Sequence, residues 1–298
     1  MPMVEMARTA PFDEASDLLA DPSLLRRRAS ADGYLFLPGL LNDGALPATS
    51  QAVLEVAADH GLLDGDERPI ESGFLTEWQD TPRFRAYYRD ILQLRAFHQL
   101  ALHPAIIAVC HSLFSEPTLA HPRNILRTVF PGHPEYTTDP HQDHRPIHGS
   151  TGTWTAWIPL SDCPSELGGL ALVQGSHRGG LREVPADSIS LASVDRWEWR
   201  CGPMRRGDVL MFHSLTVHQA RDNEKMDEIR FSCDFRYQAA SSPVHEHSLL
   251  PHLRHQTWEE VYAGWPADDP LRYYWRELDL NVQLDAPSEP PADPPDDG

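Results

Sequence analysis

Between His121 and Gln238 the chain is a series of short β-rich runs separated by proline and glycine. The runs expected to form strands are 125–130, 152–160, 170–174, 208–219 and 229–238. Neighbouring parallel strands need long crossover connections, usually helices, and no helical pattern separates these runs. The spacing therefore predicts a β-sandwich or jelly roll and argues against a doubly wound α/β sheet.

Helical patterns flank the β-rich region. Amphipathic spacing predicts helices over 12–31, 46–60, 83–97 and 104–114, a short buried strand at 34–39 and a polar loop over the pocket at 62–81. We expect mainly β structure with flanking helices in one domain over 1–284, divided into a largely helical part at 12–118, a jelly-roll core at 119–240 and a helical segment at 251–280. The proline-rich and acidic residues 285–298 are expected to be disordered.

Composition narrows the partners and the compartment. The formal net charge of -19 would repel nucleic-acid phosphates and anionic lipid headgroups, so neither nucleic acid nor a membrane is an expected partner. The four cysteines are widely spaced and form no C-x-x-C motif, which indicates free thiols in a reducing cytoplasm. The N-terminus lacks a signal-peptide pattern, so we predict a cytoplasmic protein.

The stretch from Thr138 to Arg145 contains the motif His141-Gln142-Asp143. On an extended strand, residues two apart point the same way, so an imidazole and a carboxylate would lie side by side with Gln142 turned away. Two histidines and one carboxylate on one face of a metal form the site of non-haem Fe(II) oxygenases. An H-x-D motif alone also fits a surface turn with a polar pair, so a second histidine is needed.

That histidine is expected between Gly207 and His218, a segment that offers His213 and His218. We favour His218 because Arg230 follows twelve residues later and opens a strand with alternating polar and apolar residues. A guanidinium with a hydroxyl two residues on, at Ser232, is suited to holding a carboxylate such as that of 2-oxoglutarate. The alternative is that this polar face decorates an exposed strand.

These motifs resemble, in order and spacing, the phytanoyl-CoA dioxygenase family of Fe(II)/2-oxoglutarate oxygenases. The resemblance covers roughly residues 24–237 and rests on the opening stretch Gly33–Leu41, His141-x-Asp143, the Gly168–His177 segment with its Gly-Ser-His turn, Gly207-Asp208 leading to His218, and Arg230-x-Ser232. It implies a double-stranded β-helix, a cupin-like jelly roll, in which His141, Asp143 and His218 bind Fe(II).

The same resemblance implies where the other ligands bind. Arg230 would hold the distal carboxylate of 2-oxoglutarate with help from Ser232, and Asn124 and Thr128 fall where such enzymes contact the cosubstrate or substrate. The residues expected near the substrate are Arg127, His144, Arg145 and Trp157. Chlorinating members of the family replace the carboxylate ligand with a small residue, so Asp143 favours hydroxylation or desaturation.

The implied function is a dioxygenase that consumes O2 and 2-oxoglutarate, releases succinate and CO2, and oxidises a small molecule. We expect a specialised-metabolite intermediate as substrate and a monomer or homodimer in solution. One alternative is a hydroxylase of an acyl-CoA or of a carrier-bound acyl group. The other is a cupin-like metal- or ligand-binding protein without redox turnover.

Overall fold

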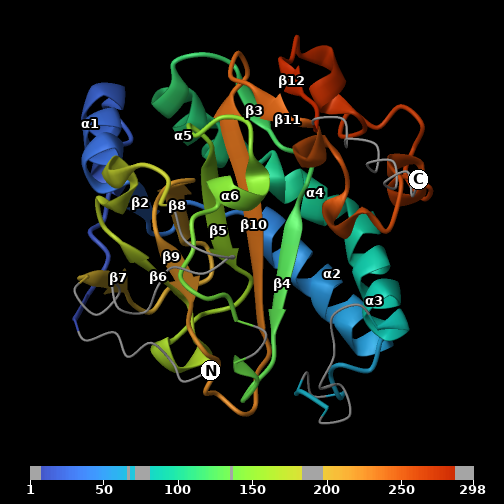
Figure 1. Ribbon diagram of the computed structural model, residues 1–298. Helices are drawn as coiled ribbons and strands as arrows, with labels where there is room; N and C mark the ends of the chain where they lie inside the picture. The colour runs from blue at the N-terminus through green and yellow to red at the C-terminus, as the bar shows by residue number, and fades with distance from the viewer. Residues whose placement is uncertain (1–7, 66–67, 71–80, 135–136, 183–196, 286–298) are drawn as a thin grey trace, which may run out of the picture.

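Two sheets that face each other form the centre of the protein (Figure 1). The computed structural model describes residues 8–65, 68–70, 81–134, 137–182 and 197–285. The larger sheet has the order β2-β8-β5-β10-β3, with β4 also paired to β10. Its strands are β2 (Tyr34–Leu37), β3 (Thr118–Ala120), β4 (Ile125–Val129), β5 (Trp154–Pro159), β8 (Val209–His213) and β10 (Arg230–Ala239).

The smaller sheet has the order β1-β7-β6-β9. Its strands are β1 (Thr9–Ala10), β6 (Leu170–Val173), β7 (Trp199–Cys201) and β9 (His218–Ala220). Apolar side chains from both sheets pack together, among them Trp157 and Leu210 from the larger sheet and Leu172 from the smaller one. Apart from β1, which runs parallel to β7, the strands of both sheets pair antiparallel. The jelly-roll fold class predicted from the sequence is confirmed.

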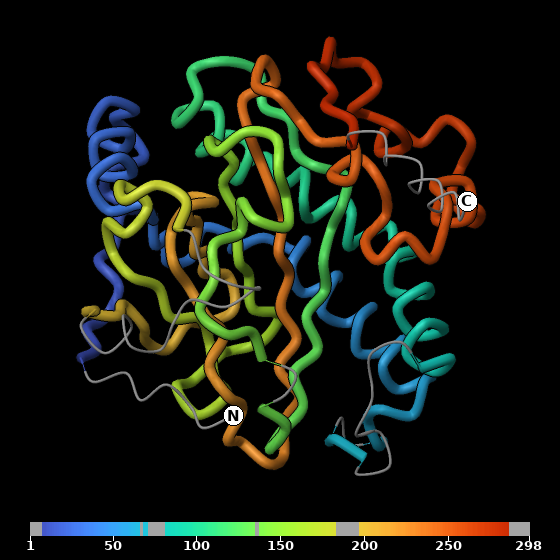
Figure 2. The backbone as a smooth tube through the Cα atoms, viewed as in Figure 1, coloured from blue at the N-terminus to red at the C-terminus, as the bar shows by residue number. Residues whose placement is uncertain are grey.

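Helices cover the outer face of the larger sheet, as Figure 2 shows. They are α1 (Pro22–Asp32), α2 (Ala45–Asp59), α3 (Pro82–Gln93), α4 (Arg95–Ala101) and α5 (Pro104–Phe114). Local signals fix their ends: the Asp21 carboxylate accepts hydrogen bonds from the amides of Ser23 and Leu24, and Gly33 ends α1 in the left-handed conformation. The helix predicted over 12–31 is shorter than expected, because only a 3-10 turn, η1 (Ser16–Leu18), precedes α1.

Strand β10 separates the helices from the interior of the jelly roll. Its apolar side chains, Phe231, Cys233, Phe235 and Tyr237, belong to the cluster that the helices cover. Its polar side chains, Arg230, Ser232, Asp234 and Arg236, point to the other side, and each is buried. Burying charged groups is costly unless they find partners, so this face requires a polar environment inside the protein.

The segment Arg95–Phe114 is long and apolar enough to cross a membrane by length and composition alone. In the structure it is divided into α4 and α5, and Leu102 and His103 lie between them. Phe97, Leu100 and Ile106 from this segment are fully buried in the main core. The segment therefore forms part of the packing of the domain.

The C-terminal part is less helical than the prediction for 251–280. It contains the short helices η6 (Glu246–Leu249), η7 (His252–Arg254), α8 (Trp258–Val261) and η8 (Tyr274–Glu277), and the strands β11 (Val244–His245) and β12 (Val282–Gln283). Pro266 and Pro270 interrupt the helical spacing, because proline cannot donate to a helix and clashes with the preceding turn. Outside the C-terminal part, the short helix α6 (His144–Ile147) directly follows the H-x-D motif. The tail predicted to be disordered lies outside the described residues from 286 onward, and most of the loop predicted at 62–81 does as well.

Candidate active site

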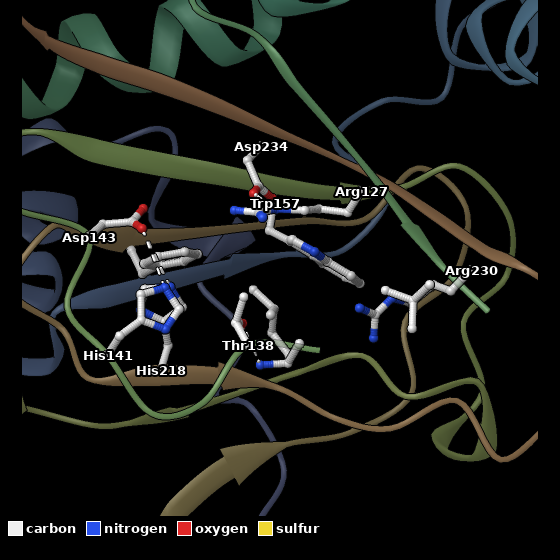
Figure 3. Close-up of a pocket in the computed structure, with 12 residues that line it drawn as sticks. Arg127, Thr138, His141, Asp143, Trp157, His218, Arg230 and Asp234 are labelled. Atoms are coloured by element: carbon white, nitrogen blue, oxygen red, sulfur yellow. Dashed lines mark hydrogen bonds and ion pairs between the residues drawn. The ribbon is translucent and has the colours of Figure 1, made fainter. Parts of the chain in front are cut away.

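A pocket opens between the two sheets and brings together residues that are far apart in the sequence (Figure 3). Its lining consists of Arg127, Val129, Thr138, His141, Asp143, Trp157, Leu170, Phe212, His218, Ala220, Arg230 and Asp234. In Figure 3 the two histidines and Asp143 lie at one end, Arg230 lies at the other, and Trp157 lies between them. The polar face of β10 therefore faces this pocket and not solvent.

His141, Asp143 and His218 meet at one end of the pocket, with their ligand atoms all within 4.8 Å of one another. Asp143 Oδ1 lies 3.6 Å from His141 Nε2 and 3.8 Å from His218 Nε2. The ring centroids of the two histidines are 4.2 Å apart. Two imidazoles and a carboxylate at this spacing are the donor set expected for a non-haem ferrous ion.

The two histidines are held in the orientation that a metal ligand needs. His141 Nδ1 donates a hydrogen bond to the carbonyl of Asp139 at 2.7 Å, and His218 Nδ1 donates to the carbonyl of Thr216 at 3.0 Å. Because a carbonyl can only accept, each Nδ1 carries a proton, so in the neutral form of either ring the free lone pair is on Nε2. The amides and carbonyls of His141 and His218 also bond to each other at 2.9 and 3.0 Å, which fixes the two backbones side by side.

The His218 ring remains neutral in this environment. Burial, together with the neighbouring His141, lowers its pKa to about 3. Phe212 packs against the ring with centroids 4.3 Å apart. A neutral imidazole with an unprotonated Nε2 is the form that binds a metal.

Asp143 lies at the N-cap of α6 in a helical conformation, with φ -60° and ψ -28°, and not on an extended strand as the sequence predicted. Its side chain still lies beside that of His141, and Gln142 is turned away to donate to the carbonyls of Gly180 and Leu215. The tight turn that starts α6 thus achieves the placement that a strand would have given.

Two further residues hold the Asp143 carboxylate. The Thr155 hydroxyl donates to Oδ2 at 2.6 Å, and Arg236 Nη2 lies 3.4 Å from Oδ1. Burial by itself would raise the pKa of Asp143, but Arg236 and the two histidines lower it well below its ordinary value. The carboxylate is therefore ionised, with Oδ1 facing the histidines.

The Gly-Ser-His turn after β6 positions His218. Ser176 Oγ donates to the carbonyl of Val173 at 2.7 Å and accepts from the amide of Val217 at 2.9 Å. The residue before His218 is therefore tied to the end of a neighbouring strand. His213, the other histidine of this segment, contacts the rings of Trp154 and His177 and is not in the cluster.

At the other end of the pocket, Arg230 is 2% exposed. Its Nη1 donates to the carbonyl of Arg221 at 3.1 Å, whereas its Nε has no partner among the described residues. Burial is the main cause of the lowered pKa of Arg230, about 10, so the guanidinium is still charged at neutral pH. The neighbouring Ser232 hydroxyl, fully buried, also lacks a partner in the described chain.

A buried cation and an unpaired hydroxyl are costly unless a ligand pairs with them. A carboxylate fits both, because it accepts charge-assisted hydrogen bonds and neutralises the guanidinium. The residues present therefore fit the two groups that the sequence implied: a metal ion at the histidines and a keto acid whose carboxylate reaches Arg230.

The remaining predicted site residues fall into two groups. Arg127 and Trp157 line the pocket, and Arg127 Nε forms an ion pair with Asp234 Oδ2 at 2.8 Å. Thr128, Asn124, His144 and Arg145 are not among the residues that line the pocket. Thr128 shares a hydrogen bond with the Tyr87 hydroxyl at 2.9 Å, on the helix side of β4.

Asn124, His144 and Arg145 also lie away from the pocket lining. Asn124 Nδ2 donates to His98 Nδ1 at 3.2 Å, and Arg145 Nη2 donates to the carbonyl of Arg182 at 2.6 Å. His144, the first residue of α6, is partly buried. None of Asn124, Thr128, His144 and Arg145 is among the residues that line this pocket, and their predicted contacts with cosubstrate or substrate stay predictions.

The sequence interpretation missed several residues that support the site. Thr155, Ser176, Asp234 and Arg236 contact other site residues, and Phe212 packs on His218. The alternation of polar and apolar residues in β10 could have predicted that Asp234 and Arg236 border the site, because both lie on the same face as Arg230. Ser176 lies in the Gly-Ser-His turn identified from the sequence, but its bond to Val217 depends on a tertiary contact, and Thr155 gave no signal of its own.

A family model described as phytanoyl-CoA dioxygenase (PhyH) matches residues 29–230. Two similar proteins are named 1-deoxypentalenic acid 11-beta-hydroxylase. The protein from Streptomyces arenae is 28% identical over 263 residues, which is 80% of this chain and 89% of that protein. The protein from Streptomyces exfoliatus is 27% identical over 267 residues and covers the same shares, 80% and 89%.

Solved structures of similar proteins share the fold. One is the epimerase SnoN in complex with Fe3+, alpha ketoglutarate (2-oxoglutarate) and nogalamycin RO, with a TM-score of 0.56, 25% identity, and coverage of 76% of this chain and 86% of SnoN. The carbocyclase SnoK from nogalamycin biosynthesis has a TM-score of 0.53 at 24% identity and covers 79% of this chain and 89% of SnoK. The resemblance predicted from the sequence is confirmed by the family match.

Proposed function

Because the chain belongs to the phytanoyl-CoA dioxygenase family, we propose that it is a non-haem iron, 2-oxoglutarate-dependent dioxygenase that hydroxylates a small molecule of specialised metabolism. One observation carries this proposal: a His-Asp-His donor set and a buried, incompletely paired arginine lie at opposite ends of one pocket. A metal-binding protein without redox turnover has no use for the second feature, which disfavours the cupin-like alternative.

We assign the roles as follows. His141, Asp143 and His218 hold Fe(II) through Nε2, Oδ1 and Nε2, and Thr155 and Arg236 keep the carboxylate in place. Arg230 and Ser232 bind the distal carboxylate of 2-oxoglutarate. Trp157, which lies between the two ends of the pocket, limits the space through which the cosubstrate reaches the metal.

Iron, 2-oxoglutarate and O2 together supply an oxidant able to take hydrogen from an unactivated C–H bond, with succinate and CO2 as by-products. The chain's own residues provide the geometry. His141, Asp143 and His218 all lie at one end of the pocket, so a ferrous ion that they held would face the rest of the pocket, where the cosubstrate, O2 and the substrate would have access to it. The apolar lining, including Phe212 and Leu170, excludes water from this part of the pocket.

The relatives support a small-molecule substrate. Both Streptomyces proteins are named as hydroxylases of 1-deoxypentalenic acid, and SnoN and SnoK are named as enzymes of nogalamycin biosynthesis. These names favour a specialised metabolite over an acyl-CoA or a carrier-bound acyl group. A cytoplasmic location, a monomeric or dimeric state, and the lack of nucleic-acid and membrane partners remain predictions from composition.

The test is an anaerobic preparation of the purified protein to which Fe(II), 2-oxoglutarate and then O2 are added. We expect succinate formation that requires iron, and a product one oxygen atom heavier when metabolite extracts are screened by mass spectrometry. Iron-independent succinate formation, or no succinate in the presence of iron and any extract, would contradict the proposal.

A further inference from the structure

Three arginines besides Arg230 gather at the metal end of the pocket. Arg127 lines it, Arg236 lies beside Asp143, and Arg123 lies in the connection between β3 and β4. The ring of His252 is buried, and burial lowers its pKa well below the ordinary value. The positive charges of these three arginines lower the pKa of His252 further. Burial and the nearby Arg236 likewise lower the pKa of Arg123 to about 10. Strand β4 pairs antiparallel with β10 so that Ile125 lies opposite Asp234, which brings Arg123, two residues earlier, level with Arg236. The amide of His121 also donates to the carbonyl of Arg236 at 2.8 Å. The three charges therefore lie close together.

The order of residues along β10 separates this cluster from the keto-acid end. Arg230 and Arg236 lie on the same face of the strand, six residues apart, which corresponds to about 20 Å of extended chain. The metal ligands lie nearer Arg236, because Asp143 Oδ1 is 3.4 Å from its Nη2. A molecule bound at the three arginines would thus lie beside the metal and away from the 2-oxoglutarate carboxylate at Arg230.

The carboxylates near these arginines are too few to balance them. Among the described residues in contact with them, Asp234 pairs with Arg127 at 2.8 Å, and Asp143 lies beside Arg236. Asp143 is also the proposed iron ligand, so its charge is shared with the metal. Asp285 pairs with His245 and with His247, whose backbone carbonyl accepts from Arg123, and in the described chain it forms no ion pair with the three arginines. With iron bound to Asp143, Asp234 is the one carboxylate among the described contacts of these three guanidinium groups that does not also hold the metal.

Donor atoms in the cluster are also left unused. Arg236 is 6% exposed, and its Nε has no partner in the described part of the chain. The buried Nε of Arg123 has none among the described residues either, although its Nη1 donates to the carbonyl of His247 at 3.0 Å. Buried, unpaired guanidinium donors in a chain with a net charge of -19 are a locally unfavourable arrangement that an anion would relieve.

We propose that the substrate is an organic carboxylate whose acidic group binds to Arg123, Arg127 and Arg236 while its carbon body extends over the metal. The planar fork of arginine matches a carboxylate and would fix the orientation of the substrate, and therefore the carbon that is oxidised. This inference rests on the proposed function, since it takes the metal and 2-oxoglutarate sites as occupied.

The test uses the full-length protein loaded anaerobically with Fe(II) and 2-oxoglutarate, so that Arg230 is already engaged. Calorimetry measures binding of acetate, cyclohexanecarboxylate and adamantane-1-carboxylate, each against its neutral primary amide. We expect the larger acids to bind about tenfold or more tightly than their amides, with a preference that weakens as salt is added.

Arg123→Gln is the main variant, because Arg123 has no acidic partner among the described residues. Its removal therefore leaves no carboxylate without a partner. It should reduce the preference for acid over amide to threefold or less, and Arg123→Lys should restore part of it. Arg206→Gln, on the exposed surface, is the matched control and should bind the acids like the wild type.

The charge-transfer absorption that Fe(II) and 2-oxoglutarate give together is recorded in every sample. The inference is overturned if no acid of the series binds more tightly than its amide, if Arg123→Gln keeps the full preference, or if the acid displaces 2-oxoglutarate and abolishes the absorption. Failure of the proposed function has a different signature, because the wild type would then show no such absorption before any acid is added.

Discussion

Two clusters in the described chain have the same composition, two histidines and one aspartate. The first is His141, Asp143 and His218, and the second is His245, His247 and Asp285. In the second, His245 Nε2 lies 3.2 Å from Asp285 Oδ1 and His247 Nε2 lies 3.0 Å from Oδ2, distances shorter than the 3.6 and 3.8 Å of the first. In each set the ligand atoms lie within 4.8 Å of one another, so the donor set does not distinguish them and neither does this limit.

The hydrogen bonds behind the rings do distinguish them. In the first cluster each Nδ1 donates to a carbonyl, so in a neutral ring the lone pair lies on Nε2, on the side of Asp143. In the second, His245 Nδ1 accepts from the amide of His247 at 3.3 Å, so the neutral ring carries its proton on Nε2, directed at Asp285. The Arg254 guanidinium also lies 3.2 Å from His247 Nε2, where a metal would be repelled.

The comparison teaches that the environment, and not the ligand list, makes a metal site. The first aspartate is 3% exposed and is held by Thr155 and Arg236, whereas the second is exposed. The second cluster lies where β12 pairs with β11, so it serves to anchor the C-terminal segment by ion pairs. Four substitutions test whether iron and 2-oxoglutarate bind at the first cluster and its pocket and not at the second cluster. They are given from the largest expected effect to the smallest.

Asp143→Ala should abolish substrate-coupled turnover, because it removes the one anionic ligand of the proposed iron site. The measurement is succinate release with iron, 2-oxoglutarate and substrate present. Asp285→Ala is the matched control from the second cluster and should retain activity. Normal succinate production by Asp143→Ala would show that the site has been assigned to the wrong residues.

Arg230→Ala should raise the KM for 2-oxoglutarate about 30-fold or more, since losing one partner of a buried charged pair costs roughly 2 kcal/mol or more. Iron binding should change far less, because Arg230 lies at the opposite end of the pocket. Steady-state kinetics and an iron titration separate the two effects. An equal loss in both would mean that Arg230 supports the structure and does not bind the cosubstrate.

Thr155→Val should weaken iron binding about tenfold, because removing a hydrogen bond behind a metal ligand typically costs one to two orders of magnitude. The valine has nearly the same shape, so the fold is kept, and Thr151→Val on the surface is the control. An unchanged iron affinity would indicate that Arg236 alone holds the carboxylate.

His247→Ala should leave iron affinity and turnover unchanged and lower the free energy of unfolding by less than about 1 kcal/mol, because exposed ion pairs contribute little. Thermal and urea unfolding measure the second quantity. A clear loss of bound metal would place a functional ion at the second cluster.

The sequence predicted the elements with strong local patterns. The alternation of polar and apolar residues in β10 predicted both of its faces, and the H-x-D and Arg-x-Ser motifs contain His141, Asp143 and Arg230, which line the pocket. The backbone at Asp143 was not predictable, because a strand and a helix start can both place its side chain beside His141.

The sequence also did not show which face of β4 borders the pocket. Both faces of this strand are largely buried, so polarity does not reveal which one borders the pocket. The pairing of Ser232 with Arg127 settles the question, and it puts Thr128 on the helix side. Such a register depends on contacts more than one hundred residues apart, which local patterns do not encode.

The most direct test of the account is the amount of Fe(II) bound per chain, measured by anaerobic titration with and without 2-oxoglutarate. The wild type and His247→Ala should each bind one ion, and His218→Ala should bind none with comparable affinity. If His218→Ala retained the ion and His247→Ala lost it, the metal would belong to the second cluster and the proposed active site would be wrong.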